Sequence, residues 1–221
     1  MTVDVALAAL IDHTLLRPDA VGAEVDRLCD EARQFGFRTV CVQPCFVGRA
    51  AQRLAGSSVG VATVAGFPHG ATTTAAKVFE AHQAVADGAT EVDMVANLGW
   101  IRAGDAAAVG KEVAAIVAAC PGVAVKVILE TALFTDDAAK TAVARAAADA
   151  GAAFVKTSTG FGPGGATVED VALLRAAVGA EVGVKASGGI KTRAQALAMV
   201  AAGANRIGSS ASVVLVTLPD R

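Results

Sequence analysis

Aromatic side chains are scarce in this chain, and tyrosine is absent altogether. Eight Phe and one Trp make up the aromatic content of 4% in 221 residues. Proteins that bind nucleic acid use aromatic stacking platforms or clustered basic patches. Here Lys and Arg are spread along the chain without a basic run, and the formal net charge is −2. Both features argue against nucleic-acid binding.

The usual ligands of a structural metal site are also few, with four Cys and three His in the whole chain. Cys41 and Cys45 have a C-x3-C spacing, but no second Cys/His pair completes the four ligands that zinc requires. Disulfide frameworks are typical of short secreted domains rather than of a chain this long. We therefore interpret the cysteines as reduced thiols and predict neither a metal nor an organic cofactor.

Long hydrophobic runs are missing too, although hydrophobic residues make up 54% of the chain. The longest runs have about eight residues, as at 113–120, whereas a membrane span needs about 20. The N-terminal segment lacks a basic region and contains Asp4 and Asp12, which argues against a secretory signal peptide. We therefore expect a cytoplasmic protein that does not bind membranes.

What the sequence does contain is a regular alternation of short β-branched runs and Ala-rich stretches, which predicts one (β/α)8 TIM-barrel domain over residues 1–221. The predicted strands are 9–14, 38–43, 59–65, 91–95, 123–129, 153–157, 182–186 and 204–208. The predicted helices are 19–35, 45–55, 71–88, 104–119, 136–150, 167–178, 191–202 and 210–217. Residues 3–10 could instead form a short N-terminal helix.

The competing architecture is an open, doubly wound sheet that binds a dinucleotide. Its glycine fingerprint is absent after the first predicted strand, and the nearest match is GFGPGG at 160–165. This segment has the fingerprint spacing, but Pro163 and its late position in the chain fit a strand-to-helix loop better. The sequence therefore favours the barrel.

Charged residues lie inside several predicted strands. Four of them stand out: Asp93, Lys126, Lys156 and Lys185. A barrel places its active site at the C-terminal ends of its strands, so these positions are candidates for chemistry. One buried lysine is usually structural, and a buried ion pair that fills the barrel remains the alternative. Three lysines on consecutive strands favour a functional group.

Neighbouring lysines provide a way to make an amine nucleophilic. Two ammonium groups about 5 Å apart repel by roughly 3 kcal/mol at an effective dielectric constant of 20. This repulsion lowers a lysine pKa by about two units, and burial lowers it further. Lys156 is the better nucleophile because the small polar residues 157–160 follow it. Lys185 then supplies positive charge and relays protons, Asp93 is an acid/base partner, and Lys126 pairs with Asp93 or Glu130.

Two glycine-rich segments follow the last two predicted strands. Gly188-Gly189 and Gly208-Ser209-Ser210 occupy the positions at which barrels often bind phosphate through backbone N–H groups. Gly160-Phe161-Gly162 is expected to close the same pocket, and Thr159, in the polar run 157–160, is expected to orient the substrate. We therefore predict a phosphorylated small-molecule substrate.

The first two strands offer further candidates for the pocket wall. Asp12, His13 and Thr14 end the first strand, although a lone His is more often a hydrogen-bonded structural residue. Cys41 is either a small buried apolar residue or part of the pocket. Among these, Asp12, Thr14 and Cys41 complete the predicted substrate-binding set.

Together, these segments resemble the deoxyribose-phosphate aldolases, in particular their shorter bacterial and archaeal branch. The resemblance covers nearly the whole chain and is carried by DHTLL (12–16), VCVQP (40–44), VAGFPHG (64–70), EVDMVANLG (91–99), KVILET (126–131), FVKTSTGFG (154–162), VKASGGI (184–190) and NRIGSS (205–210). It implies a Schiff-base lysine at Lys156, a proton-relaying Asp93 and an activating Lys185.

The resemblance implies reversible cleavage of 2-deoxy-D-ribose 5-phosphate into glyceraldehyde 3-phosphate and acetaldehyde, through a lysine iminium and without a cofactor. Independently of the resemblance, exposed apolar helix faces would be compatible with a homodimer or homotetramer. This chain departs from some relatives in two ways. It lacks their C-terminal tyrosine, ending in Leu218-Pro219-Asp220-Arg221, and it has Ala211 where some have a further Ser.

Two rival functions remain open at this point. One is a transaldolase-like lysine aldolase that acts on a different sugar phosphate. The other is a catalytically silent barrel that binds a phosphorylated sugar. A metal-dependent aldolase is disfavoured because the sequence contains no cluster of His ligands.

Overall fold

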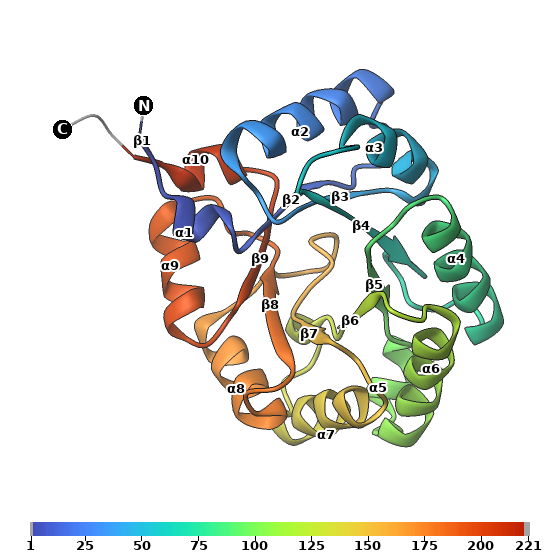
Figure 1. The fold of residues 1–221 in the computed structure, drawn as a ribbon. Coiled ribbons are helices and arrows are strands. Elements are labelled where there is room, and N and C mark those ends of the chain that lie inside the picture. The colour runs from blue at the N-terminus through green and yellow to red at the C-terminus, as the bar shows by residue number, and fades with distance from the viewer. Residues whose placement is uncertain (1, 219–221) are drawn as a thin grey trace.

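A computed structural model describes residues 2–218. The remaining positions, 1 and 219–221, lie outside the described residues, and with them most of the C-terminal end at which the tyrosine is missing. Eight parallel strands form a closed barrel in chain order, and helices surround it (Figure 1). The strands are β2 Ile11–Leu15, β3 Thr39–Val42, β4 Gly60–Ala65, β5 Glu91–Val95, β6 Ala124–Ile128, β7 Phe154–Lys156, β8 Gly183–Ser187 and β9 Arg206–Ser209. The predicted (β/α)8 barrel is confirmed.

A helix follows each strand of the barrel. The eight helices are α2 Gly22–Phe35, α3 Val47–Arg53, α4 Thr74–Ala86, α6 Ala106–Ala119, α7 Asp137–Asp149, α8 Val168–Val178, α9 Arg193–Ala201 and α10 Ser212–Val216. Each lies within a predicted helix, but most begin two or three residues later. The side chains of Thr73, Asp105, Asp136, Thr167 and Thr192 cap helix N-termini, so these residues stand outside the helices that they start.

The N-terminal segment combines both alternatives that the sequence left open. Residues Val5–Ala8 form the short helix α1, and the first barrel strand starts after it at Ile11. Three further elements were not predicted. Strands β1 Thr2–Val3 and β10 Thr217–Leu218 pair antiparallel outside the barrel, and α5 Leu98–Arg102 precedes α6. Short 3-10 turns at Pro44–Phe46 and Thr131–Leu133 complete the elements.

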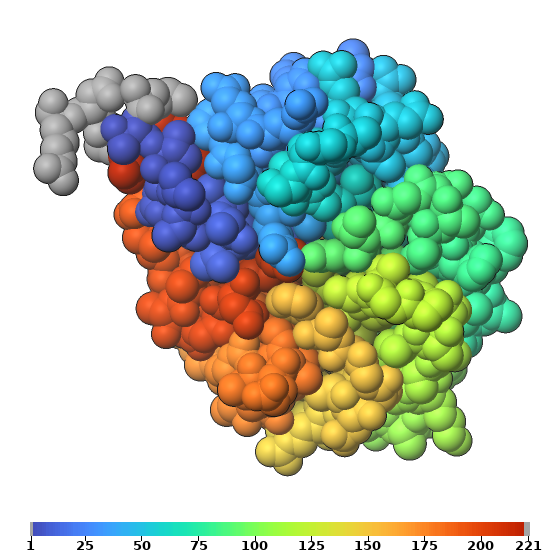
Figure 2. Space-filling view, viewed as in Figure 1, coloured from blue at the N-terminus to red at the C-terminus, as the bar shows by residue number. Residues whose placement is uncertain are grey.

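The main hydrophobic core lies between the barrel and its helices. Outward-facing strand residues such as Val92 and Val155 pack against helix residues, several of which are fully buried alanines. Because alanine has a small side chain, these helices can approach the sheet closely. Side chains also fill most of the gap that the ribbon leaves at the barrel axis (Figure 2). No helix among residues 2–218 is long and apolar enough to cross a membrane.

Candidate active site

Strand register brings the four charged candidates together inside the barrel. Lys156 on β7 is the register partner of Lys185 on β8, and Asp93 on β5 is the partner of Lys126 on β6. Each of these residues is at most 2% exposed. Alternate residues of a strand point to opposite faces, so the apolar neighbours Val155 and Val184 face the helices while the lysines face inward.

Asp93 is the centre of this arrangement. Its Oδ2 accepts hydrogen bonds from Lys156 Nζ at 2.8 Å and from Lys185 Nζ at 2.7 Å. Its Oδ1 accepts a hydrogen bond from Lys126 Nζ at 2.5 Å. Burial alone would raise the pKa of Asp93, but the three ammonium groups outweigh it and hold this pKa well below its usual range. Asp93 is therefore an ionised carboxylate held by three lysines.

Lys126 extends the cluster away from the cavity. Its Nζ lies 2.7 Å from Glu91, and Arg206 joins both Glu91 and Asp12. Of the two partners predicted for Lys126, Asp93 is therefore present, whereas Glu130 instead accepts hydrogen bonds from Thr159. Glu91 and Arg206 were missed by sequence reasoning. Glu91 begins its predicted strand, where a charged residue is usually solvated. Arg206 lies inside the predicted strand 204–208 but was not selected as a candidate.

The balance of charge inside the barrel bears on the protonation of Lys156. Three buried carboxylates face four buried basic groups, and the cluster is neutral only when one base has lost its proton. The carboxylates belong to Asp12, Glu91 and Asp93, and the bases to Lys126, Lys156, Lys185 and Arg206. An uncompensated buried charge is costly, so the interior favours one neutral base.

Lys156 is the base that becomes neutral most easily. Burial lowers its pKa, the carboxylate of Asp93 opposes this effect, and the ammonium group of Lys185 adds to it. For Lys185 and Lys126, burial acts in the same direction, but neighbouring carboxylates outweigh it and raise both pKa values. Asp12 and Asp93 are these partners for Lys185. The three lysines thus separate into one weakened base and two retained cations.

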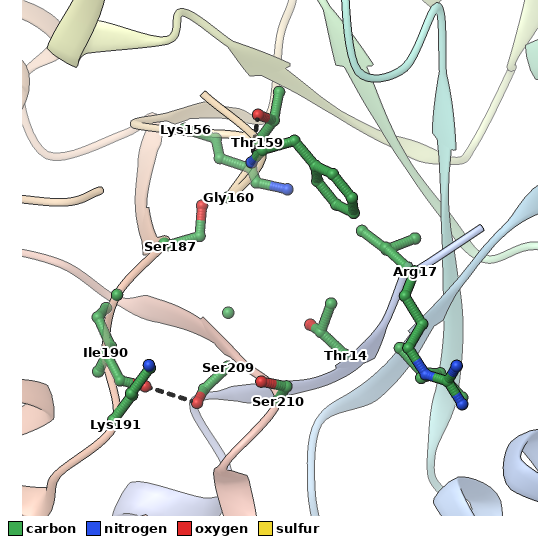
Figure 3. A pocket seen from close by; sticks show the side chains of 16 residues that line it. Thr14, Arg17, Lys156, Thr159, Gly160, Ser187, Ile190, Lys191, Ser209 and Ser210 are labelled. Carbon is green, nitrogen blue, oxygen red and sulfur yellow. Dashed lines mark hydrogen bonds between the residues drawn. The ribbon is translucent and has the colours of Figure 1, made fainter. Parts of the chain in front are cut away.

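Lys156 is also the one barrel lysine, among the described residues, that reaches the cavity. A cavity of about 340 Å³ opens at the C-terminal ends of the strands and is lined by Thr14, Leu15, Leu16, Arg17, Lys156, Thr159, Gly160, Phe161, Ser187, Gly188, Gly189, Ile190, Lys191, Gly208, Ser209 and Ser210. The Lys156 amine points into the open space, with Thr14, Ser209 and Ser210 on the other side (Figure 3). Of the three barrel lysines, Lys156 is therefore the one that can contact a ligand in the cavity.

Most of the predicted binding residues line this cavity. They are Thr14, Thr159, Gly160, Gly188, Gly189, Gly208, Ser209 and Ser210. Asp12 and Cys41 do not, because both are fully buried below it, where Asp12 bonds to Lys185 and Cys41 packs against Ala62 and Val64. His13 faces outward, and its Nε2 lies 2.7 Å from Glu31. Alternation along β2 explains why His13 leaves the barrel interior that Asp12 and Thr14 face.

The glycine-rich rim presents backbone groups to the cavity. Gly188 and Gly189 have φ values of 87° and 77°, which only glycine adopts at low cost. The Ser209 hydroxyl donates to Ile190 O at 2.8 Å, so it is already used within the protein. Ser212 likewise donates to Ser209 O. Backbone N–H groups and the exposed Ser210 hydroxyl therefore remain as the donors for an anion.

Two cationic side chains at the rim were not predicted. Lys191 is exposed and has no acidic partner within 4.0 Å among residues 2–218, whereas Arg17 pairs with Asp19 and Glu24. Lys191 follows the Gly188-Gly189 pair by two residues, which was the available signal in the sequence. A free cation beside backbone donors suits an anionic group such as phosphate.

Fold and site together define a (β/α)8-barrel protein with a buried lysine–carboxylate cluster opening into an anion-compatible cavity. Residues 6–213 match the family described as DeoC/LacD family aldolase. The chain belongs to this aldolase family.

Individual relatives agree with this assignment. The chain is 54% identical over 213 residues to a deoxyribose-phosphate aldolase of Thermoanaerobacter sp. strain X514, with 95% of each chain covered. It is 53% identical over 207 residues to one of Brevibacillus brevis, covering 94% of this chain and 93% of the relative. A tetrameric deoxyribose phosphate aldolase from Aeropyrum pernix matches in structure with a TM-score of 0.89 and 37% identity, covering 95% of this chain and 88% of the other.

Proposed function

We propose that this protein is a class I aldolase that reversibly cleaves 2-deoxy-D-ribose 5-phosphate into D-glyceraldehyde 3-phosphate and acetaldehyde. The observation that carries the proposal is the position of Lys156, a buried amine with a lowered pKa that faces the cavity. The names of the relatives support the choice of substrate. The glycine-rich rim with Lys191 supports a phosphorylated one.

In the cleavage direction, the neutral Lys156 amine attacks the C1 aldehyde of the open-chain sugar. Loss of water from the carbinolamine gives an iminium, which acts as an electron sink. Removal of the C3 hydroxyl proton then breaks the C2–C3 bond. The bonding electrons move into the iminium to form an enamine, and glyceraldehyde 3-phosphate departs. Protonation of the enamine at C2 and hydrolysis of the new iminium release acetaldehyde and restore the Lys156 amine.

Asp93 and Lys185 are the groups we assign to proton transfer, acting through a water molecule in the cavity. Both contact Lys156 or its hydrogen-bonding partner, because Lys156 and Lys185 donate to the same carboxylate oxygen of Asp93. Lys185 holds its proton firmly, so it also keeps positive charge beside the reacting amine. The protein lacks tyrosine, so the proposed relay uses only these groups and water.

We further propose that the enzyme works in the cytoplasm as a homodimer or homotetramer. Apolar side chains on the surface support self-association, among them Val5, Phe79 and Val214, which are 72%, 71% and 65% exposed. Light scattering after size-exclusion chromatography measures the mass of the assembly directly. A monomer at micromolar concentration would contradict this part of the proposal.

A donor screen tests the substrate assignment. Purified enzyme is incubated with glyceraldehyde 3-phosphate and, separately, acetaldehyde, acetone or dihydroxyacetone, and products are identified by mass spectrometry. We expect acetaldehyde to be the preferred donor and deoxyribose 5-phosphate to be the product. Preference for dihydroxyacetone would favour a transaldolase-like enzyme. Binding of the sugar phosphate without turnover would favour a silent binding protein.

A further inference from the structure

Glu130 has a backbone conformation that needs an explanation. With φ 52° and ψ 55°, it lies in the left-handed region, and it is the one non-glycine residue with positive φ among residues 2–218. This conformation costs an L-residue about 1–2 kcal/mol, whereas glycine adopts it readily. Such outliers persist where the surrounding structure determines them, often beside a functional site. We therefore expect the contacts of the Glu130 side chain to account for its left-handed backbone conformation.

The Glu130 carboxylate is buried and contacts one residue of the cavity wall. The residue is 2% exposed, and its Oε2 accepts hydrogen bonds from Thr159 Oγ1 at 2.5 Å and from Thr159 N at 3.2 Å. No Lys, Arg or His of the described chain forms an ion pair with it. A buried carboxylate without a cation depends on its N–H and O–H donors, so Thr159 and Glu130 fix one another.

This contact continues into the segment that forms one lip of the cavity. Thr159 Oγ1 accepts a hydrogen bond from Phe161 N at 3.0 Å (Figure 3). A side chain at Gly162 would bring its Cβ within 2.8 Å of Glu130 Oε1, so the loop also packs directly on the carboxylate. The ring of Phe161 meets Phe67 edge to face, at 5.3 Å between centroids. Thr159, Gly160 and Phe161 all line the cavity.

We propose that Glu130 is a positioning residue that holds segment 159–161 over the cavity for binding of the phosphorylated sugar. The proposal rests on the proposed function, in which Lys156 forms the iminium at the cavity floor. A two-carbon aldehyde needs only Lys156, whereas a five-carbon sugar phosphate extends to the lip. Loss of the Glu130 carboxylate therefore weakens productive binding of the sugar and leaves the amine chemistry intact.

Glu130→Gly is the informative variant, because glycine relieves the backbone cost while removing the carboxylate. We expect kcat/KM for deoxyribose 5-phosphate to fall about tenfold or more, mainly through KM. Borohydride trapping of acetaldehyde on Lys156 should stay within about twofold of the parent rate. Glu130→Gln should recover most of the activity, because one amide oxygen can accept both bonds from Thr159. Glu169→Gln, an exposed glutamate on α8, controls for loss of negative charge.

Thr159→Val removes the hydroxyl from the other side of the contact and serves if Glu130→Gly folds poorly. The double variant should be no worse than the more impaired single variant, because both break one interaction. A kcat/KM within about twofold of the parent for Glu130→Gly, or additive effects in the cycle, would overturn the positioning role. Failure of the parent protein to be trapped by acetaldehyde would instead overturn the proposed function, so the two failures are distinguishable.

Discussion

Lys156 Nζ and Asp93 Oδ2 lie 2.8 Å apart at the floor of the cavity, and this pair combines two opposing demands. The carboxylate orients the amine and favours its charged form. Burial and the ammonium group of Lys185 favour the neutral form, and their combined effect lowers the Lys156 pKa. An amine nucleophile needs both orientation and a free electron pair. Asp93 accepts hydrogen bonds from both Lys156 and Lys185, so the same carboxylate orients the Lys156 amine and holds beside it the ammonium group that lowers its pKa.

Replacing Lys156, the proposed nucleophile, should abolish turnover without unfolding the protein. In Lys156→Leu, the remaining Lys126, Lys185 and Arg206 balance the three buried carboxylates, so we expect thermal stability to be kept. The cleavage rate should fall at least about a thousandfold, or roughly 4 kcal/mol in activation free energy. A coupled assay for glyceraldehyde 3-phosphate and circular dichroism measure the two effects. Residual activity above about 1% would reject the nucleophile assignment.

Removing the neighbouring ammonium group should shift the pH profile. In Lys185→Leu, repulsion on Lys156 is lost and Asp93 attracts it more strongly, so the Lys156 pKa rises. The pH at half-maximal borohydride trapping should move upward by as much as about two units. Lys191→Met provides a control, because this exposed rim cation should affect KM for the phosphorylated sugar and leave the midpoint in place. An unchanged midpoint in Lys185→Leu would remove its electrostatic role.

The sequence predicts the fold and the end of the barrel at which the candidate site lies. It does not predict which charged side chains reach the cavity and which are buried below it. Strand alternation and the predicted β7–β8 adjacency were enough to bring Lys156 and Lys185 together. Asp12 was predicted to line the pocket because it lies near the end of the predicted strand 9–14, but it is fully buried below the cavity and bonds to Lys185, whereas Thr14 lines the cavity.

Glu91 and Arg206 were not identified from the sequence, and Glu130 was expected to pair with Lys126 rather than with Thr159, for a related physical reason. Glu91 and Arg206 begin their strands, and only barrel closure places them opposite one another across the interior. Glu130 follows β6, and its left-handed backbone turns its side chain under the β7–α8 loop. Both arrangements depend on contacts between side chains of different strands or their loops. A local pattern of residue types carries no information about them.

The buried carboxylates predict a loss of stability in acid. Burial favours the protonated forms of Asp12 and Asp93, but neighbouring cations outweigh it and lower both pKa values in the folded state. The two carboxylates contribute fully to folding stability above the pKa of an unfolded Asp, about 4. This stabilisation is lost as the pH falls from there through their lower pKa values in the folded state. Tm should fall steeply below about pH 4. In Asp12→Asn, measured in parallel, Tm should fall less steeply with decreasing pH. An equal dependence of Tm on pH in the parent and the variant would contradict a stabilising role for the ionised Asp12 carboxylate.

A second buried ion pair outside the site predicts a large effect on stability. Lys77 on α4 is fully buried, and its Nζ contacts Glu112 on α6 at 2.8 Å and Val95 O at 2.8 Å. Lys77→Met leaves Glu112 without a cation and should cost about 3–5 kcal/mol in urea unfolding. Lys77→Met with Glu112→Leu should recover most of this loss. A single variant as stable as the parent would show that the pair contributes little.

Iminium formation on Lys156 is tested most directly by reduction with borohydride in the presence of acetaldehyde, followed by intact mass and peptide mapping. We expect one two-carbon adduct, located on Lys156 and lost in Lys156→Leu. An adduct on Lys185 or Lys126 would contradict the assignment of the neutral amine to the residue that faces the cavity. A folded protein without a specific adduct would contradict the iminium mechanism itself.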